Sequence, residues 1–550
     1  MKCETFAFFR ELEFSKREEG LRELRENGIR YIVLAGSRTL ATSPYTVSAV
    51  AENENLAREV REFVEFAYED FDIYSLIFAG RRISNELFLN PNFVRAQSDM
   101  IARGMRKLKD VKGLYAIYIE DEPYNTWNLC PEIVRDRYND LFEEETGYRL
   151  PEEGRVEGRW NFETAMAYCH WIGEKYLEYL REIVRKCKEV CPHVKSAINL
   201  HAKAIFPSAR NPVNVYGIIK LIDILMTDIY PGWHLMPREM DNIVDFQTKF
   251  LRDLTDKPLW VILQGHLIIG GYAPTLQQIE KWALVAIENG CDAVGWYAND
   301  HNCAPHLRVC IRTQHTKYAC RERWNKMMEV SRRISELEKR KIEKTNAAIL
   351  VSFNSILSYG WLSLLYTYIT LQVDGGVRIN FITERKIEEE PETLNEYQYL
   401  YLGSSPVLRE SVMPILEDFV RKGGVITGSG SDVSYNEKGE DLSMWRKRLF
   451  GIIEEKTFWS DEPIRLTTKI GCLEQGFSLK CFWERRAIIK TQGSVDVLGV
   501  WTNGYPAIIS KAIGKGKAIY IGTRPEMANC LLGERRWADL LREIKHHFSA

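Results

Sequence analysis

Short apolar runs alternate with amphipathic segments along the first 340 residues. Eight of these runs are rich in β-branched, aromatic and Leu residues and are bounded by turn residues, a pattern that predicts buried β-strands. The predicted strands cover residues 3–9, 30–36, 71–80, 114–120, 194–200, 221–230, 257–265 and 291–298.

The segments between these strands have helical periodicity. "KREEGLRELRENG" ends at Gly28, and "TLQQIEKWALVAIENG" begins at Thr275 and ends at Gly290, so both carry helix-end signals. Residues 131–192, after the fourth strand, hold two helical segments instead of one. Eight strand–helix repeats with one insertion predict a (β/α)8 TIM barrel over residues 1–340, with an open doubly wound sheet as the alternative.

A second pattern begins after a charged helix that ends near Thr345. "NAAILVSF", "VRINFIT", "YQYLYLG" and "GGVITGSG" predict strands with helices between most of them, which is typical of a smaller α/β unit. "FSLKCFW", "DVLGVW" and "KAIYIG" add strands towards the C-terminus, before the helix "RRWADLLREIKHHF". We expect residues 346–550 to form one composite domain or two closely joined ones.

Composition narrows the possible partners. The chain has 550 residues, of which 45% are hydrophobic, enough for large cores. Its 74 basic and 76 acidic residues leave a net charge of -2, so we expect neither nucleic acid nor a membrane as a partner. The N-terminus lacks a signal-peptide core, which favours a cytoplasmic protein. Helices dense in mixed charge hint at a thermophile.

Three adjacent carboxylates close the fourth strand. Glu120, Asp121 and Glu122 precede Pro123 directly after the apolar run "LYAIYI". In a (β/α)8 barrel the active site lies at the carboxyl ends of the strands. A carboxylic acid held there can protonate a departing glycosidic oxygen. The alternative is that these are solvated loop acids or partners of nearby arginines.

The other predicted strand ends carry groups suited to sugars. Aromatic faces stack on a pyranose, and His, Asn, Gln and Asp side chains bind its hydroxyls. Asp228 is also a candidate catalytic residue. The candidate binding residues are Tyr124, Trp127, His201, Tyr230, Trp233, Gln264, His266, Trp296, Asn299, Asp300 and His301, with Tyr297 beside them.

The order of motifs resembles a known family. "IEDEP", "TDIYPGW", "KPLWVILQG" and "AIENGCDAVGWYAND" are similar to the barrel of clan A glycoside hydrolases, especially family 42 β-galactosidases. "YLGSSPVLRE", "FVRKGGVITGSG" and "PAIISKAIGKGKAIYIGT" resemble the glutaminase-like trimerisation domain of that family. The resemblance implies that Glu122 is the acid/base, with Asp121 where the family has Asn, and that the chain forms a homo-oligomer, a trimer by analogy with the family.

The chain departs from the family at the seventh strand. The family has a nucleophilic Glu there, whereas this chain has Leu263 followed by Gln264, and neither can form a covalent glycosyl-enzyme. Three mechanisms remain open. Asp121 could orient a 2-acetamido group that attacks the anomeric carbon, Asp228 or Asp300 could act as nucleophile or inverting base, or the barrel could bind sugar without cleaving it.

We therefore predict a glycoside hydrolase that cleaves small β-linked glycosides, of galactoside, glucosaminide or N-acetylglucosaminide type, from the non-reducing end. The alternative is a non-catalytic carbohydrate-binding or scaffold protein. We expect no cofactor. The segment after the eighth strand has two further possible roles. A structural metal could be bound by His301, Cys303, His306 and Cys310, or a disulfide could form between two of Cys303, Cys310 and Cys320.

Overall fold

A computed structural model of the chain describes residues 2–9, 14–34, 45–80, 85–123, 131–151, 161–201, 213–234, 236–268, 272–297, 299–304, 309–339, 343–458, 462–482 and 484–548. The chain divides into two compact units. Unit 1 comprises Met1–Val156 and His170–Ile342, and unit 2 comprises Glu157–Cys169 and Glu343–Ala550.

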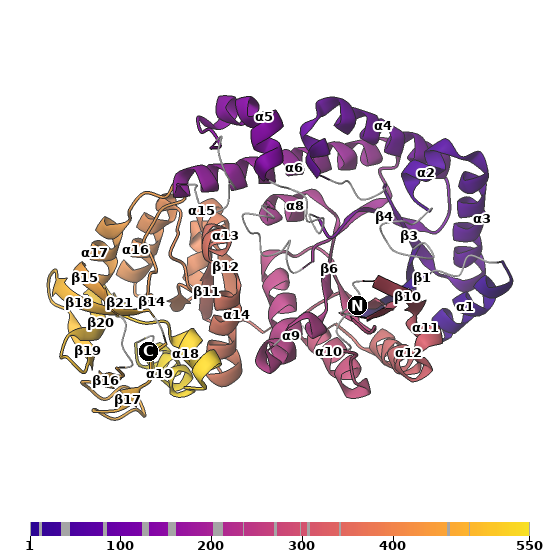
Figure 1. Cartoon of the computed structure of the whole chain (residues 1–550). Coiled ribbons are helices and arrows are strands. Elements are labelled where there is room, and N and C mark those ends of the chain that lie inside the picture. Colours follow the sequence, from indigo (N-terminus) through magenta and orange to yellow (C-terminus); the bar gives the residue numbers. More distant parts are fainter. Residues whose placement is uncertain are drawn as a thin grey trace. The chain divides into compact units, whose positions relative to one another are not determined.

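The described part of unit 1 contains a closed barrel of eight parallel strands in chain order, which confirms the predicted (β/α)8 fold and excludes the open sheet (Figure 1). The last strand pairs with the first, with Phe6 opposite Gly295. Each predicted strand is present. The strands are β1 Glu4–Phe9, β2 Tyr31–Leu34, β3 Tyr74–Phe78, β4 Leu114–Asp121, β5 Lys195–Asn199, β6 Ile224–Ile229, β7 Leu259–Gln264 and β8 Ala293–Tyr297.

Alternate residues of these strands fill the barrel interior, because side chains of a strand point to opposite faces in turn. Phe6 stacks on Trp260 with ring centroids 5.1 Å apart. Gly295 is required beside them, since a Cβ at this position would lie 2.4 Å from the Phe6 ring. The buried interior cluster comprises Phe6, Phe8, Val33, Leu76, Phe78, Ala116, Tyr118, Ala197, Ile224, Met226, Trp260, Ile262 and Ala293.

Helices follow the strands and bury their apolar faces against them. Thr275 caps α10 as predicted: its side chain accepts from the Gln278 backbone N–H, and the Gln278 side chain accepts from the Thr275 N–H. The insertion after β4 is formed by α5 and α6. The helices are α1 Phe14–Glu26, α2 Val47–Glu52, α3 Glu54–Phe71, α4 Pro91–Leu108, α5 Pro131–Thr146, α6 Phe162–Val190, α8 Val215–Leu221, α9 Pro237–Leu254, α10 Leu276–Glu288, α11 Thr316–Ala319 and α12 Arg321–Glu336.

A β-hairpin follows the barrel. Its strands are β9 (Asn299–Ala304) and β10 (Val309–His315), and Cys303 is paired with Cys310 in their register. Their side chains and residues 305–308, which include His306, lie outside the described residues, so the predicted metal or disulfide stays a prediction there. Cys320, a third candidate for that disulfide, is a free thiol.

Unit 2 is organised around one sheet. Among the described residues it has nine strands in the order β12-β11-β13-β14-β21-β20-β19-β16-β17, so the C-terminal strands extend the same sheet as the predicted α/β strands. β15 pairs with β18 separately. The strands are β11 Ala347–Val351, β12 Asn380–Thr383, β13 Tyr399–Tyr401, β14 Val425–Ser429, β15 Ile452–Phe458, β16 Ile464–Leu466, β17 Ser478–Leu479, β18 Arg485–Thr491, β19 Asp496–Trp501, β20 Pro506–Ile513 and β21 Gly516–Ile521.

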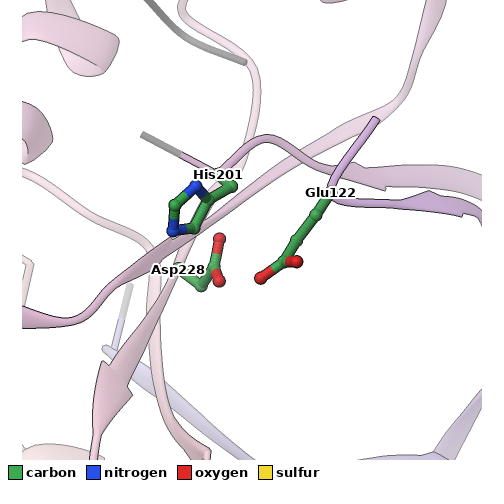
Figure 2. A group of neighbouring side chains, drawn as sticks. All are labelled: Glu122, His201 and Asp228. Atoms are coloured by element: carbon green, nitrogen blue, oxygen red, sulfur yellow. The ribbon is translucent and has the colours of Figure 1, made fainter. Parts of the chain in front are cut away.

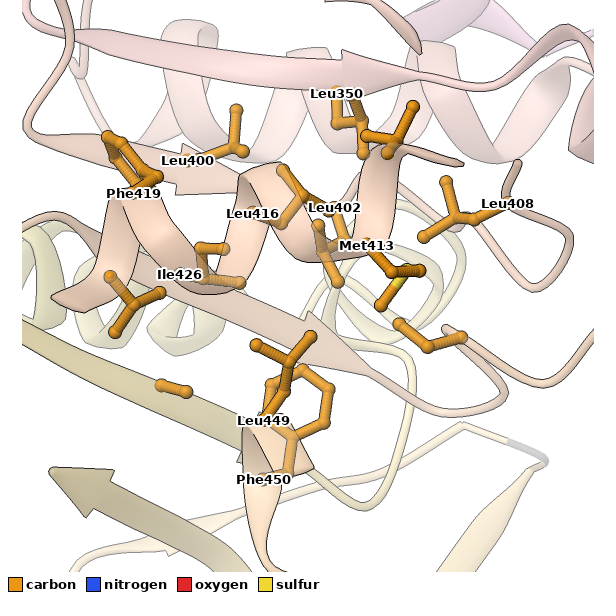
Figure 3. Packing of buried hydrophobic residues seen from close by; sticks show 14 of the residues in the cluster. Leu350, Leu400, Leu402, Leu408, Met413, Leu416, Phe419, Ile426, Leu449 and Phe450 are labelled. Carbon is orange, nitrogen blue, oxygen red and sulfur yellow. The ribbon is translucent and has the colours of Figure 1, made fainter. Parts of the chain in front are cut away.

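Helix α16 (Met413–Arg421) packs on this sheet through Met413, Leu416 and Phe419, which meet Leu400 and Ile426 of the strands (Figure 3). This is the amphipathic packing that α/β sheets require. The other helices are α13 Phe353–Tyr359, α14 Leu362–Tyr368, α15 Glu384–Glu389, α17 Ser443–Phe450, α18 Pro525–Leu532 and α19 Arg536–Phe548.

Within the described ranges, no helix is both long enough and apolar enough to cross a bilayer.

Candidate active site

The three carboxylates at the end of β4 have separate surroundings. The pairing of β4 with β5 shifts register between Tyr118 and Glu120. This shift changes the face of the sheet to which the side chains of the last β4 residues point. Tyr179 of α6 is buried, which raises its pKa, and the charge of Glu120 raises this pKa further, so Glu120 lies near the α6 side of the strand. Glu122 has a left-handed backbone, with φ of 49°, which a non-glycine residue rarely adopts outside functional or turn positions.

Asp121 is held by its neighbours. Its Oδ1 accepts hydrogen bonds from the Tyr118 hydroxyl at 2.9 Å and from Asn199 Nδ2 at 3.1 Å, and its side chain is 7% exposed. Asn199 is the last residue of β5, and its carbonyl also accepts from the Glu122 backbone N–H at 3.1 Å. These contacts orient the end of β4 against β5.

Glu122, His201 and Asp228 meet at the carboxyl ends of β4, β5 and β6. One polar atom from each lies within 4.8 Å of the others. The two carboxyl groups point into the same space, and the His201 ring lies beside Asp228 (Figure 2). Glu122 and His201 are partly exposed, whereas Asp228 is buried. The structure thus brings together two predicted catalytic residues and one predicted binding residue.

Asp228 is the most buried member of this group, at 1% exposure. Burial raises its pKa well above the ordinary range, and the negative charges of Glu122 and Asp121 raise it further. Apart from the carboxyl group of Glu122, no side chain among the described residues offers a hydrogen bond to either oxygen of Asp228.

Aromatic rings form a wall beside these groups. Tyr230 lies 6.4 Å from the His201 ring, 5.0 Å from His266 and 5.9 Å from Tyr297, between ring centroids. His266 and Tyr297 meet edge to face at 4.9 Å. The pKa of Tyr230 is raised well above its usual value, first by burial and then by the charge of Asp228. Such a wall suits the apolar face of a sugar ring.

The seventh strand has Leu263 where the resemblance implies a carboxylate, and the amide of Gln264 follows it. Gln264 ends β7, and its Oε1 accepts from the Gly232 N–H at 2.9 Å while its Nε2 donates to the His266 carbonyl at 3.0 Å. It therefore links the segment after β6 to the segment after β7. The preceding Leu263 is fully buried.

Trp296 is not part of the site, which corrects its prediction as a binding residue. It is 2% exposed, and its indole Nε1 donates to Ser331 of α12 at 3.1 Å. The reason is strand alternation, because Gly295 and Tyr297 face the interior and Trp296 faces the surrounding helices.

The remaining predicted residues differ in how far the structure describes them. Trp233, in the 3-10 turn Pro231–Trp233, is 53% exposed. Tyr124 and Trp127 lie outside the described residues, as do the side chains of Asn299, Asp300 and His301. Their roles stay predictions.

Tyr118 and Asn199 were not among the predicted site residues. Both lie in strands whose pattern predicts apolar core, so only the polar groups of these two side chains could have indicated a role in the site. A buried Tyr hydroxyl or Asn amide needs a partner. At the carboxyl half of a barrel strand, that partner is often a site residue.

The donor types of Glu122, His201 and Asp228 are ones that a divalent cation accepts. The 4.8 Å limit on their separation is wider than the roughly 3.4 Å between two ligands of a tetrahedral ion with bonds of about 2.1 Å. This spacing does not by itself define a metal site.

No protein-family model matches the chain, and no curated protein matches it. Solved structures do match, over nearly its whole length. Gan42B, a GH42 β-galactosidase from G. stearothermophilus, has a TM-score of 0.76 at 13% identity, covering 99% of this chain and 88% of that one. The β-galactosidase of the Antarctic haloarchaeon Halorubrum lacusprofundi has a TM-score of 0.76 at 14% identity, covering 99% and 90%.

A third match is the exo-β-1,4-mannosidase Op5Man5 from Opitutaceae bacterium strain TAV5, with a TM-score of 0.64 at 12% identity, covering 98% of this chain and 95% of that one. The chain therefore has the fold of GH42 and related clan A glycosidases, a TIM barrel followed by a mixed α/β sheet with C-terminal strands. At these identities the likeness concerns the fold.

Proposed function

We propose that the chain is a glycoside hydrolase that cleaves small β-linked glycosides from the non-reducing end, with Glu122 as general acid/base. The observation that carries the proposal is the position of Glu122. It is a partly exposed carboxyl group at the carboxyl end of β4, within 4.8 Å of a second, buried carboxyl group and beside an aromatic wall. The GH42 fold supports a sugar as the ligand.

In the substrate-assisted form of this function, the oxygen of a 2-acetamido group, oriented by Asp121, bonds to the anomeric carbon as the glycosidic bond breaks and Glu122 gives its proton to the leaving oxygen. A water then bonds to the anomeric carbon as the bond to the acetamido oxygen breaks, and the proton of this water returns to Glu122. Tyr230, His266 and Tyr297 would contact the sugar ring. The galactoside, glucosaminide or N-acetylglucosaminide type of substrate remains part of the proposal, as does the orienting role of Asp121 on a 2-acetamido group.

Glu122→Gln tests the proposal. The amide cannot supply a proton, so turnover of aryl β-glycosides should fall by about 10² to 10⁴, while stabilisation by bound sugar is kept. Nitrophenyl galactoside, glucosaminide, N-acetylglucosaminide and mannoside form the substrate panel, and thermal unfolding with the free sugars measures binding. Glu59→Gln, on the exposed face of α3, is the control. A variant at Glu122 that keeps wild-type turnover would exclude the acid/base role.

A non-catalytic carbohydrate-binding protein is the second candidate. It is favoured by Gln264, which occupies the end of β7 with both polar atoms engaged in structural hydrogen bonds. This candidate predicts that sugars raise the melting temperature while no glycoside in the panel is turned over by wild type.

A further inference from the structure

The buried carboxyl group of Asp228 requires a compensating positive charge or a proton. It is 1% exposed, and among the other described residues only the carboxyl group of Glu122 faces its oxygens as a hydrogen-bonding group. An ionised carboxylate in such a place is costly, by several kcal/mol even after relaxation. A protonated one needs no donor, because its own O–H can donate to a neighbour.

The groups that face Asp228 come from three elements. Asp121 and the Tyr118 hydroxyl come from β4, and Glu122 directly follows this strand. His201 follows β5, and Tyr230 directly follows β6, the strand that contains Asp228. The charges of both β4 carboxylates disfavour ionisation of Asp228. Of these two, Asp121 is already bound by Tyr118 and Asn199, whereas Glu122 points into the same space as Asp228.

We propose that Glu122 and Asp228 form a dyad that holds one shared proton at neutral pH, with Asp228 as a positioning residue that keeps this proton available to Glu122. This inference rests on the proposed function. It also bears on the roles of nucleophile and inverting base, which the sequence left open for Asp228. A residue that retains a proton and has no exposed oxygen is not poised as a nucleophile.

The proton balance of the dyad is simple. In the first step the shared proton passes through Glu122 to the leaving oxygen, as the bond from this oxygen to the anomeric carbon breaks and the 2-acetamido oxygen of the substrate bonds to that carbon. In the hydrolytic step the bond to the acetamido oxygen breaks, as a water gives its hydroxyl to the anomeric carbon and its proton back to the pair. Removing the last proton leaves two adjacent negative charges. The pair therefore keeps this proton to a higher pH than a single carboxyl group would. A general acid works best when its proton is held near the working pH.

Asp228→Asn is the decisive variant. Asn has the same shape, but it carries neither the negative charge nor the exchangeable proton. We expect the alkaline limb of the kcat/KM profile to move at least about one pH unit lower, with the maximal kcat/KM reduced no more than about tenfold. A loss below about 10³ that is the same at every pH, with no shift of the alkaline limb, would indicate a purely structural role and overturn the dyad. A loss above about 10³ at every pH would indicate a nucleophile and also overturn it.

A second measurement does not depend on turnover. A buried acid with a raised pKa stabilises the fold at low pH, and this contribution is lost as the pH rises through the raised value. The melting temperature of wild type should therefore fall more steeply than that of Asp228→Asn on the alkaline side. Asp70→Asn, at an exposed position of α3, should match wild type. Equal slopes for wild type and Asp228→Asn would refute the shared proton.

A chelator distinguishes the proton from a cation. If EDTA lowers the melting temperature of wild type but not of Asp228→Asn, a bound cation rather than a proton neutralises Asp228, and the dyad is overturned. If wild type turns over no glycoside while the two melting profiles differ as expected, the proposed function fails and the shared proton stands.

Discussion

At the scale of single residues, burial controls where protons bind in both units of this chain. Asp432 of unit 2 accepts the backbone N–H groups of Ser405 and Ser429, yet burial raises its pKa to about 7. Glu384, the first residue of α15, accepts the Arg409 N–H, and burial likewise raises its pKa to about 7. In each case the desolvation of the charged form outweighs the hydrogen bonds that favour it.

Glu384→Gln tests this effect. Its folded pKa lies above the ordinary 4.5, so its stabilising contribution is complete at low pH and is lost as the pH rises through about 7. Between pH 5.5 and pH 8 wild type should lose about 2 kcal/mol that the variant does not lose, because Gln keeps the acceptor for Arg409 but has no charge. Urea denaturation at both pH values measures this. Glu392→Gln is the exposed control, and equal losses in wild type and Glu384→Gln would contradict the assignment.

The candidate site shows which residue-level predictions sequence can support. Glu122 and Asp228 were identified because carboxylates at the ends of apolar strands are unusual. Trp296 was assigned to the wrong face, since one residue of shift along a strand exchanges the interior for the helix side. The pairing of β8 with its neighbouring strands was needed to show that Tyr297, and not Trp296, faces the barrel interior.

At the scale of elements, helix α10 was predicted with accurate ends. Its capping residue Thr275 and the turn at Gly290 are local signals, and the structure contains both the capping box and a positive φ at Gly290. Strands β15, β16, β18 and β20 were not among the predicted strands, because three of them carry exposed or charged residues that interrupt the apolar pattern and β16 is only three residues long.

Thr275→Ala should destabilise unit 1 by about 1 kcal/mol, because the Gln278 backbone N–H loses its acceptor and the reciprocal bond weakens. Thermal unfolding of the full chain is the measurement. Gln277→Ala, an exposed change in the same helical turn, should be close to neutral. A variant at Thr275 as stable as the Gln277 control would show that the cap contributes nothing.

At the scale of the whole molecule, the fold is that of GH42 glycosidases, whereas the assembly remains a prediction. The resemblance of residues 346–550 to a trimerisation domain predicts a trimer. Size-exclusion chromatography with light scattering should give the mass of three chains, independent of concentration over the micromolar range. A mass of one chain would contradict it. The expected cytoplasmic location and thermal adaptation are likewise predictions.

The sequence by itself determined the order of strands and helices and placed Glu122 and Asp228 at strand ends, because apolar runs, caps and turn residues act over a few positions. Only the tertiary structure decided that the first eight strands close into a barrel and that β21 lies beside β14. It alone placed Asp228 within 4.8 Å of Glu122, more than a hundred residues away. Contacts of that range depend on how whole elements pack, which local patterns do not specify.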